Sequence, residues 1–130
     1  MSRKAKIFFR ILLAVYLVTV LFLCFGKFGE GPDISLSFWG IPTDKLVHFA
    51  MFFPFPILTY FSLGARPREK KRLFFALLQI LFAGFILAVF TESAQHFIPY
   101  RSGEWSDLFA DTLGLLTATL ILFPFVCRKD

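Results

Sequence analysis

Four long apolar runs, separated by short polar connections, set the strongest constraint on how this chain of 130 residues can fold. The helices they predict cover about residues 7–25, 45–63, 73–97 and 107–126. A helix needs about 20 mostly apolar residues to cross a bilayer. Because backbone groups in lipid must be hydrogen-bonded internally, each run is expected to be a helix and not an open-edged strand. The sequence therefore predicts an all-α, integral membrane four-helix bundle.

Composition agrees with this fold class. Hydrophobic residues make up 57% of the chain, whereas a soluble domain is about 45–50% apolar. Four spans use nearly all of residues 1–130, so we expect a single transmembrane domain. The first run resembles a secretory signal peptide, but its apolar part exceeds the usual length of about 7–15 residues. We expect it to be retained as a span; Gly26 and Gly29 leave cleavage open as an alternative.

Basic residues predict the orientation, because cytoplasmic loops carry an excess of Lys and Arg. Eleven fall on one predicted side: Arg3, Lys4, Lys6, Arg10, Arg66, Arg68, Lys70, Lys71, Arg72, Arg128 and Lys129. The other side has only Lys27, Lys45 and Arg101. We therefore expect both termini in the cytoplasm. The rule also accounts for the net charge of +5 without a nucleic-acid partner.

Two prolines interrupt the second predicted helix. Pro54 and Pro56 lie inside its apolar run, and a proline removes a backbone hydrogen bond and clashes with the preceding turn. The sequence predicts a kink there. Neighbouring helices commonly satisfy such kinks in membranes, so we interpret it as a packing feature and not as a moving hinge.

The second and third helices carry polar residues at their predicted outer ends. Asp44 and His48 are four residues apart and share a helix face, with Lys45 beside them. Helix capping is an equally good explanation for Asp44. Glu92 lies about 28 Å of helix rise beyond Leu73, near the outer edge of the hydrocarbon. Its candidate partners are His96, Arg101 and Lys45.

The fourth helix begins with two carboxylates. Asp107 and Asp111 are four residues apart and share a face. Asp107 suits an ordinary helix start, but Asp111 lies deeper, inside the apolar run. Carboxylates gathered near Glu92 would repel one another unless a cation intervenes or one binds a proton.

These residues are expected to converge, because helices two and four begin where helix three ends. We predict a substrate-binding pocket at this face, formed by Asp44, Lys45, His48, Glu92, Gln95, Arg101, Asp107 and Asp111. Apart from Gln79, the polar residues elsewhere in the spans are small threonines and serines. The concentration of ionisable groups at one end favours function over random scatter.

Three motifs carry a resemblance to a known family. They are Asp44-Lys45-x-x-His48-Phe49, Glu92-x-x-Gln95-x-Phe97-x-Pro99-x-Arg101 and Gly103-Glu104-x-x-Asp107-x-x-x-Asp111-x-x-Gly114. The chain resembles the VanZ-like family of bacterial membrane proteins from the second helix onward. That pattern commonly has asparagine at the position of Asp111 and leaves the position of His96 open. The resemblance implies a multi-pass protein of the bacterial cytoplasmic (inner) membrane that acts in the cell envelope, associated through the family's name with teicoplanin resistance.

Two functions are compatible with the pocket. One is binding of an envelope lipid or glycan intermediate, with Lys45 and Arg101 holding phosphate or carboxylate. The other is an intramembrane hydrolase or transferase acting on a lipid-linked substrate, with Arg101 stabilising negative charge. Its catalytic residues are unknown; the candidates are Glu92, His48 and Asp107.

Other function classes are less compatible with the sequence. A transporter is disfavoured because the ionisable groups stop at one leaflet and no inverted repeat is visible. No metal or other cofactor is expected, because no dedicated spacing such as His-Glu-x-x-His is present. Membrane lipids are the expected partners, Trp39 and Trp105 are expected interface anchors, and the oligomeric state is left open.

Overall fold

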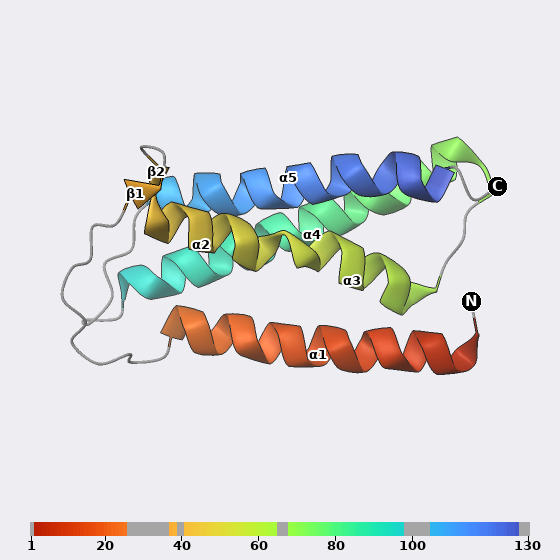
Figure 1. Cartoon of the computed structure of the whole chain (residues 1–130), viewed down its shortest axis with the longest axis horizontal. Coiled ribbons are helices and arrows are strands. Elements are labelled where there is room, and N and C mark those ends of the chain that lie inside the picture. Colours follow the sequence, from red (N-terminus) through yellow and green to blue (C-terminus); the bar gives the residue numbers. More distant parts are fainter. Residues whose placement is uncertain (1, 26–36, 39–40, 65–67, 98–104, 128–130) are drawn as a thin grey trace.

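The computed structural model describes residues 2–25, 37–38, 41–64, 68–97 and 105–127 (Figure 1). The elements are α1 (Arg3–Phe25), β1 (Ser37–Phe38), β2 (Ile41–Pro42), α2 (Thr43–Phe52), α3 (Pro54–Leu63), α4 (Lys70–His96) and α5 (Trp105–Cys127). Within these residues, four helical segments are long and apolar enough to span a membrane, with Lys45–Leu63 of α2 and α3 acting as one. The predicted all-α membrane fold is confirmed. The two strands are only two residues each and pair antiparallel.

Successive spans run in opposite directions. Figure 1 shows the starts of α1 and α4 at the same end of the bundle as the ends of α3 and α5. The starts of α2 and α5 lie at the opposite end with the ends of α1 and α4. α5 packs against α2, α3 and α4, and α1 packs against α3 and α4. This antiparallel order places the basic starts of α1 and α4 far from the acidic start of α5.

The predicted kink is confirmed as a break between α2 and α3. The break falls at Phe53, directly before Pro54. Phe53 keeps a right-handed helical conformation (φ −56°, ψ −43°) and its N–H donates to the Phe49 carbonyl at 3.0 Å. The chain therefore keeps its helical path, while Pro54 and Pro56 leave two carbonyls of the preceding turn without an amide donor.

A side chain of α1 supports this break. The Tyr16 hydroxyl donates to the carbonyl of Met51, which lies in the turn before the prolines. The carbonyls that lose their amide donors are those of Ala50 and Phe52, four residues before the prolines, so this hydrogen bond ties α1 to the turn at the break and does not replace a lost donor.

Tyr16→Phe is therefore expected to destabilise the protein by about 1 kcal/mol, because it removes this donor and little else. Thermal unfolding in detergent micelles would measure the loss. Thr19→Val is the matched control, since the Thr19 hydroxyl donates to the Val15 carbonyl of its own helix at 2.8 Å. Equal effects of the two substitutions would contradict a role for Tyr16 in supporting the break.

One glycine sets how closely α5 approaches α2. A Cβ at Gly114 would collide with the backbone carbonyl of Phe49, whereas a Cβ at Gly84 would meet only the side chains of Leu115 and Phe55. Only a residue without a side chain permits contact between the two backbones. Because Gly114 lies one turn beyond Asp111, this close approach positions that carboxylate against α2.

Basic side chains of α1 close the opposite end of α3. The helix ends at Gly64 in the left-handed conformation (φ +67°), with the Lys6 side chain against it. The Arg10 Nε donates to the Ser62 carbonyl at 3.0 Å. Cations near a helix C-terminus satisfy its last carbonyls and offset the helix dipole. These two basic residues thus have a structural role in addition to the topological one.

Candidate functional site

The site begins with an ion pair between α2 and α5. The Lys45 ammonium contacts Asp107 Oδ1, and the two side chains are 17% and 8% exposed. Lys45 stands in the first turns of α2 and Asp107 in the first turn of α5. Since these helices begin at the same end of the bundle, an ion pair between their starts links two spans at the same depth.

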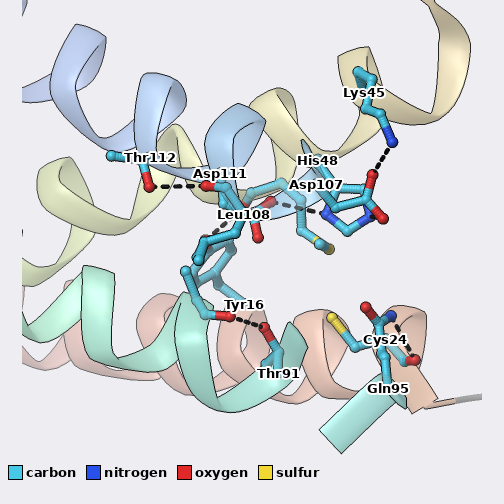
Figure 2. A network of polar contacts seen from close by, with 12 residues as sticks. Tyr16, Cys24, Lys45, His48, Thr91, Gln95, Asp107, Leu108, Asp111 and Thr112 are labelled. Atoms are coloured by element: carbon cyan, nitrogen blue, oxygen red, sulfur yellow. Dashed lines mark hydrogen bonds and ion pairs between the residues drawn. The ribbon is translucent and has the colours of Figure 1, made fainter. Parts of the chain in front are cut away.

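His48 lies between two carboxylates of α5. Its Nδ1 is 2.8 Å from Asp111 Oδ1, and its Nε2 is 3.5 Å from Asp107 Oδ2. Figure 2 shows this arrangement, with the Lys45 side chain reaching Asp107. The spacing of four between Asp107 and Asp111 puts both on the face of α5 that meets α2. Both ring nitrogens of His48 therefore face carboxylates, an arrangement that orients the ring and leaves neither nitrogen directed at a substrate.

The third carboxylate comes from α4. Glu92 is fully buried, and the Nε2 atom of the exposed His96 lies 3.7 Å from its Oε1. Glu92 is also close enough to His48 for electrostatic interaction. Of the candidate partners predicted for Glu92, His96 is thus near it, Lys45 contacts Asp107, and Arg101 lies outside the described residues.

Gln95 connects the site to α1. Its Nε2 donates to the backbone carbonyl of Cys24 at 3.0 Å, and the amide is buried (Figure 2). Tyr16, about two turns earlier on α1, is near enough to Asp111 for electrostatic interaction. All four spans therefore contribute to this end of the bundle. The contact of Gln95 with α1 could not be predicted from the sequence, because a backbone carbonyl has no sequence signature.

We refer to six residues as the polar cluster: Lys45, His48, Glu92, Gln95, Asp107 and Asp111. Of the predicted pocket residues, these six are brought together at one end of the bundle. Arg101 lies outside the described residues, as does the side chain of Asp44, although its backbone belongs to the first turn of α2. At the rim, the rings of Trp105 and His96 contact each other with centroids 4.9 Å apart and planes tilted by 32°.

The polar cluster contains more carboxylates than cationic side chains. Its described members include three buried carboxylates and one lysine. Three carboxylates in a low-dielectric site require cations, protons or hydrogen-bond donors to remain close together. Among the residues that the structure describes, no group of three or more His, Cys, Asp or Glu side chains is placed to hold a metal ion.

An apolar groove adjoins the polar cluster on the outer surface of α2 and α5. Its volume is 460 Å³, and Lys45 and Ser106 lie at the end of its lining. The remainder of the lining is apolar: Leu46, Phe49, Phe109, Ala110 and Leu113. Phe109 and Leu113 are exposed, at 67% and 40%, so this groove opens toward the surrounding lipid.

Comparison with known proteins now decides the family. The VanZ/LLP1 family profile matches residues 8–127, nearly the whole chain, including α1. The chain belongs to the VanZ/LLP1 family. No curated protein and no solved structure gives a match. Membership confirms the resemblance and extends it over the first helix.

Within the VanZ/LLP1 family, the four candidate spans make this chain a multi-pass membrane protein of a family linked to glycopeptide resistance. The polar cluster includes residues from all three motifs of the VanZ-like pattern. At the position where that pattern commonly has asparagine, Asp111 is held by His48. An asparagine there would keep an oxygen acceptor for the imidazole but would not carry a charge.

Proposed function

We propose that the chain binds an envelope lipid or lipid-linked glycan intermediate, with the hydrocarbon chain in the α2–α5 groove and the headgroup at the polar cluster. The observation that supports this most is the groove itself: 460 Å³ of mostly apolar lining that includes Lys45, a member of the polar cluster. Ligand sites are typically apolar clefts with a few placed polar groups that fix orientation.

The acidic character of the polar cluster restricts which kind of headgroup can bind. Ionised carboxylates only accept hydrogen bonds, so Glu92, Asp107 and Asp111 favour a headgroup rich in hydroxyl or amine donors. Sugar hydroxyls have this property. Lys45, together with Arg101, would hold a phosphate or carboxylate beside them. A lipid-linked saccharide combines a hydrocarbon chain, a phosphate and sugar hydroxyls in one molecule.

The basic end of the bundle supports an orientation. The starts of α1 and α4 carry Arg3, Lys4, Lys6, Arg10, Lys70, Lys71 and Arg72. Such clusters are retained in the cytoplasm. We therefore place both termini inside and the polar cluster at the outer leaflet of a bacterial inner membrane, where envelope intermediates are used.

Binding is tested by native mass spectrometry of the purified protein with a polyprenyl diphosphate-linked saccharide, using phosphatidylglycerol as the bulk lipid. Lys45→Gln and Glu92→Gln are expected to weaken retention of the saccharide lipid about 10- to 100-fold each, because each substitution removes a charged contact worth about 1.5–3 kcal/mol. Arg101→Ala is expected to act in the same direction.

Thr117→Ala is the matched control for binding, since the Thr117 hydroxyl donates to Leu113 of its own helix at 2.7 Å, away from the polar cluster. Equal retention by the parent, Glu92→Gln and Arg101→Ala would overturn the proposed site. The same samples, incubated and analysed for products, also test the hydrolase or transferase alternative: turnover that Glu92→Gln abolishes would replace the binding proposal with an enzyme.

A further inference from the structure

A glutamine amide faces outward inside the third membrane span. Gln79 is exposed on α4, seven residues beyond Arg72, which is about 10 Å along the helix. It lies too deep for its side chain to reach the headgroups. Among the residues that the structure describes, no side chain or carbonyl hydrogen-bonds its amide. An amide in hydrocarbon without a partner is costly, so this side chain requires one.

The surface around Gln79 is hollowed. A groove of 590 Å³ lies between α4 and α5, with Gln79 and Thr112 as its polar lining residues. The Thr112 hydroxyl donates to the Leu108 carbonyl of its own helix at 2.8 Å. A second groove of 280 Å³ continues along the same two helices and shares part of the lining. The amide is thus the one polar group along this face whose donors and acceptor are directed outward, among the residues described.

Two occupants can be compared by chemistry. A lipid acyl chain would fill the grooves but offers neither donor nor acceptor to the amide. A second copy of the chain offers both, because an amide is self-complementary: its NH₂ donates to the partner's carbonyl oxygen, and its own oxygen accepts in return. Glutamine side chains that hydrogen-bond across helices are a known source of association in membranes.

The charge asymmetry of the bundle fixes how two copies would meet. Both copies must insert in the same direction, because the basic residues at the starts of α1 and α4 retain that end on one side. Their two-fold axis is then parallel to the membrane normal, and Gln79 of each copy lies at the same depth. The exposed Phe82 and Phe85, at 65% and 38%, flank the grooves and can fill those of the other copy.

We propose that the chain forms a parallel, two-fold symmetric dimer in the membrane through the exposed face of α4, with the Gln79 amides hydrogen-bonded to each other across the axis. This interface lies on the α4–α5 groove and not on the α2–α5 groove. Dimerisation is therefore independent of the proposed lipid binding and can be tested separately.

Single-molecule subunit counting in phosphatidylglycerol and phosphatidylethanolamine vesicles, over a range of protein-to-lipid ratios, measures the dimer dissociation constant. Gln79→Leu is expected to weaken association about tenfold, the effect of losing two interhelical amide hydrogen bonds. Gln79→Asn keeps the amide and is expected to retain part of the affinity. Thr19→Val on α1 is the control, with no change expected, since that exposed hydroxyl is satisfied within its own helix.

A cysteine pair provides a second measurement, because a disulfide traps the dimer covalently and reports which residues meet at the interface. In a Cys24→Ala and Cys127→Ala background, Gln79→Cys is expected to form an intermolecular disulfide on mild oxidation, whereas Thr19→Cys is not. A monomeric parent at every protein-to-lipid ratio would overturn the proposal. So would a dimer that Gln79→Leu leaves unchanged, or retained acyl lipid at the α4–α5 groove of a monomer.

Discussion

Replacing His48 by leucine is expected to lower the free energy of unfolding by about 3 kcal/mol, because it leaves a buried carboxylate without its main partner. Asp111 is 1% exposed and has His48 Nδ1 at 2.8 Å. Asp107 would keep a cationic partner in this variant, since Lys45 also contacts it. The principal cost of His48→Leu is therefore the stranded Asp111, and thermal unfolding in detergent micelles should register it.

A double-mutant cycle separates this cause from lost packing. His48→Leu combined with Asp111→Leu is expected to be more stable than His48→Leu alone, because the second substitution removes the stranded charge. Asp111→Asn alone should cost little, since it keeps an oxygen acceptor for the imidazole. His96→Leu is the control histidine: it is exposed and 3.7 Å from Glu92, so a much smaller loss is expected. Additive losses in the cycle would show that the two side chains are not coupled.

Gly114→Ala is expected to destabilise the protein by about 2–3 kcal/mol, since the new methyl group would force the backbones of α5 and α2 apart. Gly84→Ala is the matched control. Its methyl group would meet the Leu115 side chain at 2.6 Å and the Phe55 ring at 2.9 Å, and side chains can rotate where a backbone cannot. The loss for Gly84→Ala should be less than half as large.

The same pair of variants also tests the link between packing and binding. Because Gly114 is one turn from Asp111, separation of α5 from α2 would lengthen the contact between Asp111 and His48. Gly114→Ala is thus expected to lose retention of the saccharide lipid, while Gly84→Ala should keep it. Native mass spectrometry on the folded fraction measures both. If Gly114→Ala bound normally, the close contact would be dispensable for the polar cluster.

The number of spans and the kink could be predicted because both depend on local properties. Apolar length decides whether a segment can cross a bilayer, and the prolines interrupt helical hydrogen bonding wherever the helix lies. The structure begins the helices somewhat earlier than predicted, at Arg3 for the first and Lys70 for the third. Basic residues continue these helices beyond the apolar runs, so hydropathy alone placed the starts too late.

The sequence predicts which residues form the polar cluster but not which of them pair with one another. A spacing of four shows that Asp107 and Asp111 share a face, and alternating helix direction brings that face to the same end as His48 and Glu92. The pairing of Lys45 with Asp107 depends on how each helix is rotated about its axis. No residue spacing within one helix contains that information.

The sequence by itself determined the four spans, their alternating direction, the kink, and the accumulation of ionisable residues at the end opposite the basic starts of α1 and α4. These follow from hydrophobic length, proline chemistry and charge distribution, all of which are local. Only the tertiary structure decided that His48 lies between two carboxylates, that Gln95 bonds the Cys24 carbonyl of α1, and that Gln79 faces outward. The physical reason is that helix rotation and approach are set by packing between distant segments, such as the contact of Gly114 with α2, which no local pattern specifies.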